Sequence, residues 1–487
     1  MKIKKLVSFI FILAMVFSLA ACGKKEDDKG TDTSTTPAPS TSEDTDKPDD
    51  EPAPTEEPVV DKYPEFDFAG REIKVGLWWD YYYTSEHTDI TDDPGLSNPE
   101  TAQMKLDNVR RIEEKYNVKI KFVNLGWDGI IESINTSITA GTPECDIYYT
   151  DLQFGIPAAV NGLAQDLTSF VDPDSDLFTD QIILKPLEAL GGTYFFAEQG
   201  LPQNGIFLGY NATMLDELGL EDPQALYARG EWTWDKFAEY AAAGTKDTDN
   251  DGTVDVYGYG GVFTDFVNGL LQNNGANLAS TQTEGLSSQA TVETLEFIDR
   301  IYNQDKSGRP WNWDDWNDNL LAWADGKVMF WTGQAWLLKQ EADAAAAEGA
   351  ELPFEYHVVP YPIGPSGDGT VSSPVSGNWY IVPVGVGEPE KVFQIFEEFS
   401  NWHQGETELR DDPTWFESCF TSYEDVEIAY STGEKLKLDV WDKLSPGFDF
   451  GPTIWGPIVV DKTSTVAQAV EAAKPVLQDA IDAFYTE

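Results

Sequence analysis

Aromatic rings and a carboxylate stand together in the run Trp78-Trp79-Asp80, which three tyrosines follow at once. A sugar ring has an apolar C–H face and a rim of hydroxyls, so a site for it needs flat aromatic rings with carboxylates or amides beside them. Tyr149 and Asp151 repeat this combination further along the chain. These five residues are therefore candidate ligand-binding residues; the alternative is that they pack in the core, cap a strand or line a solvated loop.

A second group of oxygen ligands is formed by Asp247, Asp249, Asp251 and Asp255. Alternating carboxylates with a glycine at the sixth position resemble an EF-hand calcium loop, in which hard oxygens converge and the glycine permits the turn. The twelfth position is also glycine, where an EF-hand has a bidentate glutamate. A structural calcium ion and a solvated acidic turn are both compatible with this pattern. We expect no other cofactor to be required.

Residues for catalysis form no recognisable pattern. The three histidines, His87, His357 and His403, lack metal-ligand spacing, and neither a G-x-S-x-G nucleophile motif nor a Walker phosphate loop occurs. With 85 acidic residues, some carboxylate pair always looks suitable for glycoside hydrolysis. We therefore expect no enzyme activity. A secreted glycoside hydrolase and a surface glycan-binding adhesin remain the alternatives.

The charge of the chain limits its partners. The net charge is −53, and it becomes −56 without residues 1–21, which carry three lysines and no acid. Such a chain repels nucleic acid and anionic lipid, so we expect neither as a partner. Cys145 and Cys419 are the cysteines that remain beyond the N-terminal region, and the sequence leaves open whether they pair.

The N-terminus has the form of an export signal. Lys2, Lys4 and Lys5 precede an apolar run over residues 6–21, which is too short to span a membrane comfortably and ends at Cys22. Its last residues, LAAC, resemble the lipobox of bacterial lipoproteins, in which the cysteine is lipidated and becomes the first residue. This resemblance implies a signal peptide over residues 1–21 and a palmitate-type anchor on Cys22 at the extracellular face of the cell membrane. The alternative is an ordinary secretory signal.

An acidic segment over residues 22–62 follows, with almost no apolar side chains. It cannot bury enough surface to offset the entropy of ordering, so we expect a disordered linker. The remaining chain, from about residue 63, is long enough for two lobes.

Regular elements position the candidate residues. Apolar residues alternate over residues 71–77 and 118–123, and residues 145–149 form a short apolar run, which together predict three strands. Helical spacing over 104–116 and 130–138 predicts helices between them. Strand, helix and strand in succession indicate a parallel sheet. Ligands bind beyond the carboxyl ends of such strands, where the first candidates lie.

Seven segments in order resemble the family 1 extracellular solute-binding proteins, the group that includes the maltose-binding proteins. They are RIEEKYNVKI at 111–120, AGTPECDI at 140–147, GLAQDLT at 162–168, LGYN at 208–211, WTWD at 232–235, DGKVM at 325–329 and SGNWYIVP at 376–383. The resemblance implies an α/β, two-lobed periplasmic-binding-protein type II fold with a ligand cleft between the lobes. The first lobe would comprise residues 63–195 and 378–440, and the second lobe 196–377 and 441–487.

The resemblance also implies that the protein captures a small solute for the permease subunits of an ABC importer. The argument from aromatic rings favours a sugar as this solute. The lipid anchor would be the protein's one contact with the membrane. The resemblance places Trp336 as a stacking residue of the second lobe, Trp379 at the crossing back to the first lobe, and Trp455 near a late aromatic of the cleft. Thr150 replaces an aromatic residue of the maltose-binding pattern, which argues against maltose itself.

Overall fold

The computed structural model describes residues 62–485 except 88, 94, 95, 97, 181, 199–204, 281, 313, 314, 348–351, 376, 434 and 442–447. Residues from Lys62 onward form one compact unit. The predicted signal peptide, Cys22 and nearly all of the acidic linker lie outside the described residues. Within the described part of the chain, no helix combines the length and the apolar character that a membrane span requires.

The first sheet has the strand order β11-β3-β1-β2. Its strands are β1 (Arg71–Leu77), β2 (Val118–Asn124), β3 (Ile147–Asp151) and β11 (Asn378–Ile381). β1 runs parallel to both β2 and β3, and β11 is antiparallel to β3. The carboxyl ends of β1, β2 and β3 therefore meet at one edge, as the sequence predicts.

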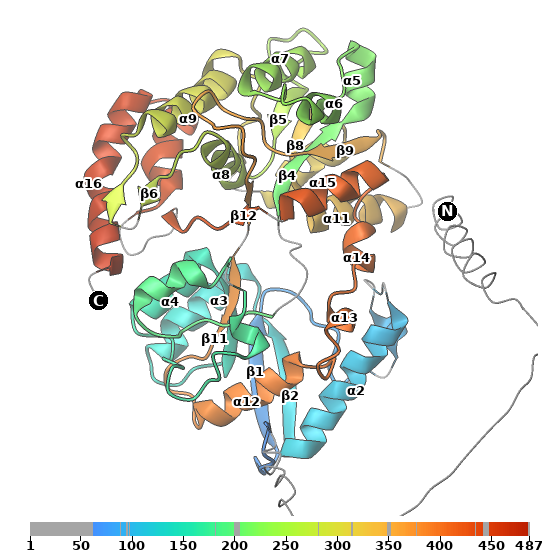
Figure 1. Cartoon of the computed structure of the whole chain (residues 1–487), viewed down its shortest axis with the longest axis vertical. Coiled ribbons are helices and arrows are strands. Elements are labelled where there is room, and N and C mark those ends of the chain that lie inside the picture. Colours follow the sequence, from blue (N-terminus) through green and yellow to red (C-terminus); the bar gives the residue numbers. More distant parts are fainter. Residues whose placement is uncertain are drawn as a thin grey trace, which may run out of the picture. The chain divides into compact units, whose positions relative to one another are not determined.

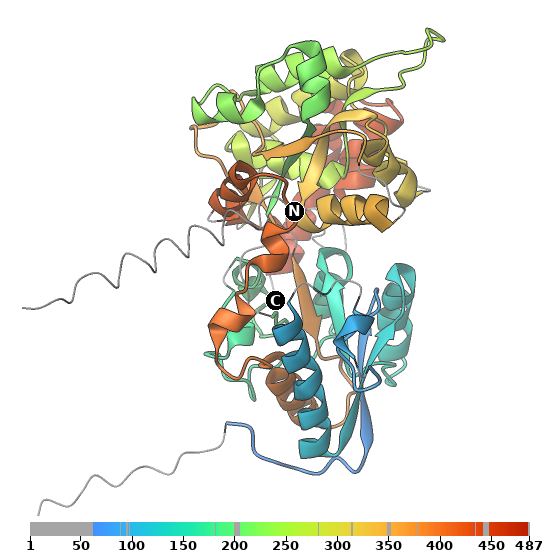
Figure 2. The ribbon, with the colours of Figure 1, turned by 90° about the vertical axis from the view of Figure 1, so that its right-hand side faces the viewer.

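Helices cover both faces of the first sheet. Ile147 of β3 packs in a core cluster with α2 (Pro99–Tyr116) and α12 (Pro389–Ser400). The next residue, Tyr148, packs in another cluster with α3 (Trp127–Ser133) and α4 (Leu152–Val160). Successive side chains of a strand point to opposite faces, so these helices form two layers. Figures 1 and 2 show α2 and α12 on one side of the sheet and α3 on the other.

The second sheet has the strand order β5-β8-β4-β9. Its strands are β4 (Ile206–Asn211), β5 (Tyr257–Gly260), β8 (Val328–Gln334) and β9 (Tyr356–Val359). β5 and β8 are parallel, whereas β4 is antiparallel to both β8 and β9. The carboxyl ends of β5 and β8 thus lie side by side.

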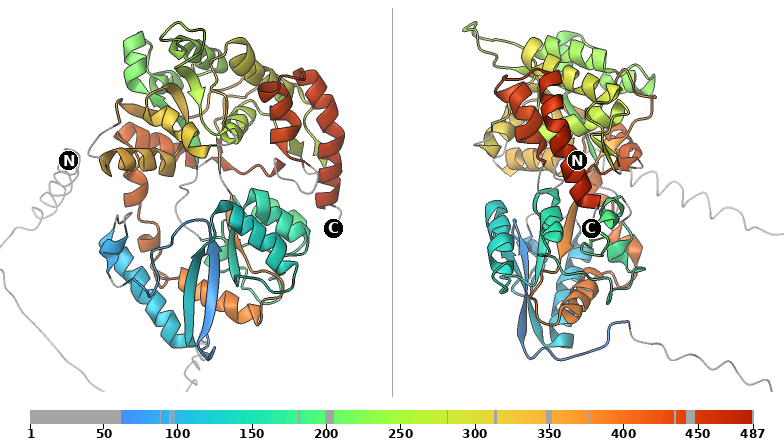
Figure 3. Two further views of the ribbon diagram at one scale, coloured as in Figure 1. Left: turned by 180° about the vertical axis from the view of Figure 1, so that it is seen from behind. Right: turned by 90° about the vertical axis from the view of Figure 1, so that its left-hand side faces the viewer.

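Helices pack around the second sheet, and the C-terminal helix α16 contacts α9 and η7, as Figure 3 shows. The helices are α5 (Ala212–Leu218), α6 (Pro223–Ala228), α7 (Trp234–Gly244), α8 (Phe263–Asn273), α9 (Gln289–Asp299), α10 (Trp316–Ala324), α11 (Ala335–Ala347), α15 (Tyr423–Gly433), the π-helix η7 (Gly451–Val460) and α16 (Val466–Tyr485). Shorter elements include α13 (Thr407–Arg410), α14 (Thr414–Glu417), β10 (Ser373–Pro374) and β12 (Leu436–Lys437).

One stretch departs from the expected division of the chain. Residues 378–440 were expected in the first lobe, but α15 packs on β9 and Phe416 of α14 belongs to the core cluster around β8. α12 does pack against α2, in the first layer. The pattern of apolar residues in a short helix shows which of its faces is buried but not which sheet buries it, so this boundary could not be derived from periodicity.

Candidate functional site

Five aromatic rings gather at the carboxyl edge of the first sheet. The ring of Trp78 lies 5.3 Å from Trp79, 5.1 Å from Trp127, 4.9 Å from Tyr149 and 5.8 Å from Phe154, between centroids. Most of these contacts are edge-to-face, a preferred arrangement of aromatic pairs. We call these five residues the aromatic platform.

Two rings of the platform are exposed and rest on the others. Trp79 keeps 36% of its surface exposed and Trp127 keeps 39%, whereas Phe154 is buried. Trp127 begins α3 directly after Gly126, whose φ of 66° is a left-handed conformation that glycine adopts without strain. Rings that are exposed yet held by neighbours can stack on a solute with little loss of side-chain entropy.

Hydrogen-bonding groups adjoin the platform. Asn124, at the end of β2, donates from Nδ2 to Oδ1 of Asp80 at 2.9 Å, and its own Oδ1 accepts from the N–H of Gly126 at 3.0 Å. An exposed carboxylate and an amide are therefore fixed next to the exposed rings. Asp151 caps α4 by accepting from the N–H of Gln153 at 2.7 Å, the capping role that the sequence left open.

Tyr149 stays neutral in this setting. Burial raises the pKa of its hydroxyl, and the nearby carboxylates of Glu198 and Asp151 raise that pKa further. Its hydroxyl is therefore a neutral group that can donate or accept a hydrogen bond.

The second sheet presents an exposed tryptophan at its carboxyl edge. Trp336 stands in the first turn of α11, directly after β8, with 43% of its surface exposed. Its indole Nε1 donates to Oε1 of Gln334 at 2.7 Å, and Nε2 of Gln334 donates to Oδ2 of Asp265 at 2.8 Å. The orientation of this ring thus depends on a buried carboxyl group of α8.

The structure encloses two of the predicted tryptophans. Trp379 has 0% of its surface exposed and donates from Nε1 to the carbonyl of Ile183 at 3.1 Å. Trp455 is also buried and packs against Phe263 and Tyr302. Neither ring can stack on a solute in this conformation, because neighbouring side chains occupy its faces. A role for Trp379 and Trp455 in binding therefore stays a prediction.

Sequence reasoning overlooked five residues of these arrangements: Asn124, Trp127, Phe154, Gln334 and Asp265. Trp127 carried the same signal as Trp78, an aromatic residue soon after an alternating strand. Asp265 and Gln334 are 69 positions apart in the sequence, and the parallel pairing of β5 and β8 brings them together.

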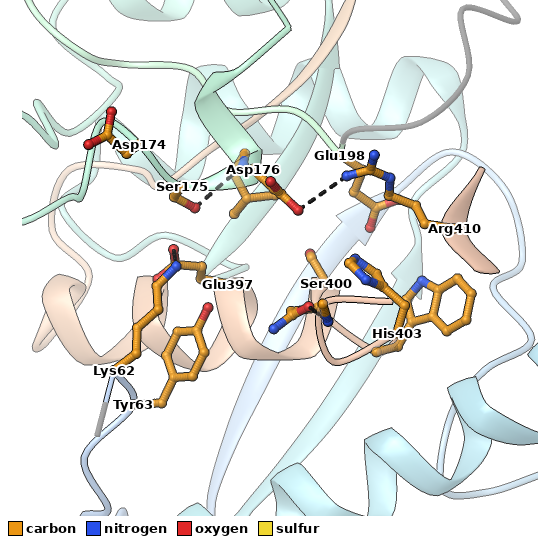
Figure 4. A pocket seen from close by; sticks show the side chains of 14 residues that line it. Lys62, Tyr63, Asp174, Ser175, Asp176, Glu198, Glu397, Ser400, His403 and Arg410 are labelled. Atoms are coloured by element: carbon orange, nitrogen blue, oxygen red, sulfur yellow. Dashed lines mark hydrogen bonds and ion pairs between the residues drawn. The ribbon is translucent and has the colours of Figure 1, made fainter. Parts of the chain in front are cut away.

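The structure also has a separate polar pocket of about 240 Å³. No residue of the aromatic platform lines this pocket. Residues 174–177 and the segment from the end of α12 to Arg410 form much of its wall, and Nη1 of Arg410 lies 3.1 Å from Oδ2 of Asp176 (Figure 4). Two buried polar atoms of its lining residues have no hydrogen-bond partner among the described residues, Oγ of Ser400 and Nδ1 of His403, whereas Oε1 of Glu397 lies 3.4 Å from Nζ of Lys62. Such a wall suits ordered water.

The acidic loop brings three of its four predicted ligands together. Carboxylate oxygens of Asp247, Asp249 and Asp255 all lie within 4.8 Å of one another. Asp251 is turned to other contacts: its N–H donates to Asp247 and Asp249, and its carboxylate accepts from the N–H of Thr253. The three oxygens fit a hard cation such as calcium, although a full shell needs further ligands.

The surroundings of the twelfth loop position explain why it holds a glycine and not the glutamate of an EF-hand. Gly258 lies on β5, where a Cβ atom would come within 2.1 Å of the carbonyl oxygen of Ala241. No side chain fits there, and Asp255 approaches the first ligand instead.

Cys145 and Cys419 are both buried, and no disulfide joins them. Burial raises the pKa of the Cys145 thiol to about 12, which keeps it protonated and unreactive at neutral pH.

Comparisons with known proteins agree with the geometry. A profile of bacterial extracellular solute-binding proteins matches residues 97–402, more than half of the chain. Among curated proteins, none matches the sequence significantly.

Solved structures share the fold at low sequence identity. The ABC substrate-binding protein Lmo0181 from Listeria monocytogenes, in complex with cycloalternan, is 16% identical with a TM-score of 0.58 over 85% of this chain and 98% of its own. A solute-binding protein from Thermotoga lettingae, bound with α-D-tagatose, is 17% identical with a TM-score of 0.57 over 86% and 100%. UgpB from Mycobacterium tuberculosis, in complex with glycerophosphocholine, is 16% identical with a TM-score of 0.56 over 84% and 98%.

Proposed function

Because the chain belongs to the bacterial extracellular solute-binding proteins, a family without catalytic activity, we propose that it captures a carbohydrate outside the cell and delivers it to an ABC importer. The observation that carries the proposal is the aromatic platform with Asp80 and Asn124 beside it. Exposed indole rings match the C–H face of a sugar, and the adjacent carboxylate and amide match its hydroxyls.

The second sheet supports the same solute class. Trp336 is an exposed ring with its polar edge already engaged by Gln334, which leaves the flat face for stacking. We propose that this ring and the platform bind opposite sides of one solute, in a cleft that closes around it.

A small polar ester is the alternative solute. The structural relatives were solved with cycloalternan, α-D-tagatose and glycerophosphocholine, so the fold accommodates more than sugars. The excess of acidic residues in this chain disfavours anionic groups, whereas neutral sugars are unaffected by it.

A thermal-shift screen tests the proposal. The purified protein is heated with single mono- and oligosaccharides, with glycerophosphocholine and with buffer alone. A solute that binds the folded state alone raises the melting temperature, and at about 100 times its Kd it adds about 2.7 kcal/mol of stability. We expect a shift with at least one carbohydrate, and chromatography should recover that sugar intact.

Other outcomes would contradict parts of the proposal. A shift with glycerophosphocholine but with no sugar would replace the solute class. A shift without any change in the radius of gyration by small-angle X-ray scattering would argue against closure and favour a surface adhesin.

A further inference from the structure

A hydrogen-bonded chain links a buried carboxyl group to the exposed ring of Trp336. Asp265 stands in the first turn of α8, just beyond the end of β5, and Gln334 is the last residue of β8. Since β5 and β8 are parallel neighbours, their ends meet, and Gln334 bridges from Asp265 to Trp336 with bonds of 2.8 and 2.7 Å.

The direction of each bond in this chain is determined by chemistry. The indole N–H of Trp336 can only donate, so the oxygen of the Gln334 amide must face it. The amide nitrogen of Gln334 then faces Asp265, which must accept. Any change in how well Asp265 accepts is therefore passed to the ring of Trp336.

Asp265 can change its protonation state near neutral pH. Burial raises the pKa of its carboxyl to about 7, and the single hydrogen bond from Gln334 offsets only part of that effect. Among the described residues, this carboxyl is coupled to the hydroxyls of Tyr259, on β5, and Tyr361, beyond β9; burial raises the pKa of both well above their ordinary value, so they stay neutral.

Keeping this carboxyl buried lowers the stability of the folded protein at neutral pH. A pKa raised above that of the unfolded chain means that the folded state loses stability as pH rises from about 4 to about 7. A group retained against stability at the edge of a binding site is typical of a functional residue.

We propose that Asp265 is a pH-responsive positioning residue that, through Gln334, fixes the solute-facing ring of Trp336. As a carboxylate it accepts a charge-assisted hydrogen bond and holds the amide and the ring firmly. As a neutral acid it is a weaker acceptor, so the ring is freer. The effect on solute affinity rests on the function proposed above, whereas the effect on the ring does not.

Intrinsic tryptophan fluorescence of the solute-free protein, titrated from pH 5 to pH 9, tests the link. The fluorescence that Trp336 contributes is the difference in emission between the unsubstituted protein and the Trp336→Phe variant. We expect this difference to change with a midpoint near pH 7, and to be independent of pH in Asp265→Asn, whose amide oxygen accepts from Gln334 at every pH. A pH-dependent difference that persists in Asp265→Asn, or no pH-dependent difference at all, would overturn the proposal.

A second variant covers the case in which Asp265→Asn fails to fold. Gln334→Met interrupts the chain without adding charge, so the difference due to Trp336 should again lose its transition, with circular dichroism confirming the fold. A transition unchanged in Gln334→Met contradicts the relay.

A binding measurement then extends the test. For a sugar found by the thermal-shift screen, the Kd should rise several-fold between pH 8 and pH 6 in the unsubstituted protein and stay constant in Asp265→Asn. If the screen finds no sugar, the proposed function fails while the fluorescence titration still decides the relay.

Discussion

The exposed rings of Trp79 and Trp127 differ from the enclosed ring of Trp379 in what a substitution should do. Trp79→Ala removes a stacking surface, and we expect solute affinity to fall about tenfold, roughly 1.4 kcal/mol. Trp379→Ala leaves a large cavity in the core, and we expect it to lower the free energy of unfolding by about 3–5 kcal/mol. Calorimetric Kd values and urea unfolding of both variants measure the two effects.

Two further substitutions sharpen this comparison. Tyr423→Ala, at a side chain 71% exposed on α15, should change neither quantity. Trp379→Phe retains most of the ring volume, so a loss of affinity in this variant without a loss of stability would show that Trp379 contacts the solute after all.

The identity of the platform residues was only partly predictable. Trp78 and Trp79 follow a strand with clear alternation, so their place at a sheet edge followed from the pattern. Burial of Trp379 could not be predicted, because it results from contacts with Phe195 and Ile183, which are close in space but distant in sequence. A tryptophan in a core and one in a site have the same local sequence signal.

At the scale of elements, strands were easier to predict than helices. The predicted strand over 71–77 agrees with β1, and that over 118–123 falls one residue short of β2. The predicted helix over 130–138 is instead α3 from Trp127 to Ser133 followed by a π-helical turn. Alternation has a sharp period of two, whereas the π-helical turn over Ile134–Ile138 departs from the helical period in the second half of this segment.

We propose that the acidic loop between α7 and β5 binds calcium. Calorimetry on chelator-treated protein should show one site, and Asp247→Asn combined with Asp249→Asn should abolish its heat, because two of the three converging carboxylates are lost. Asp251→Asn is the matched control, since that carboxylate lies outside the converging group; it should retain binding. The absence of calcium heat from the unsubstituted protein would identify the loop as a solvated acidic turn.

An ion pair between half-buried His357 and buried Asp425 joins β9 to α15. Asp425 accepts hydrogen bonds from Nδ1 of His357 at 3.0 Å, the N–H of Val358 at 2.9 Å and Nε2 of Gln224 at 2.8 Å. The bond to Asp425 raises the pKa of His357, and although burial opposes it, hydrogen bonding lowers the pKa of Asp425.

This pair should make stability depend on pH in both directions. The raised pKa of His357 adds stability that is complete below about pH 6.5 and is lost as pH rises. The lowered pKa of Asp425 adds stability that is present above about pH 4 and is lost as pH falls. Asp425→Asn should therefore cost about 3 kcal/mol near pH 5.5 and flatten the profile, as urea unfolding across pH would show. An unchanged profile in this variant would mean that other groups set the pH dependence.

At the scale of the molecule, the order of motifs indicated the fold because several motifs, such as RIEEKYNVKI, LGYN and DGKVM, mark a junction between a helix and a strand. The profile match and the shared fold of solved structures confirm that inference. The division into lobes was less predictable: α12 and α15 are separated by only 22 residues, yet they pack on different sheets. Only tertiary contacts decide such an assignment.

Cys22 lies outside the described residues, and its role as the attachment point at the cell surface stays a prediction. We propose that this cysteine carries the lipid anchor, since it ends an apolar run and precedes an acidic linker that cannot bind anionic lipid by itself. Cys22→Ala should move the protein from the membrane fraction to the medium and abolish incorporation of labelled palmitate, because stable anchoring requires acyl chains. Cys145→Ala is the matched control: its thiol is buried and protonated, so this variant should stay with the membrane and keep the label. Membrane retention of Cys22→Ala would instead indicate an uncleaved N-terminal segment as the anchor.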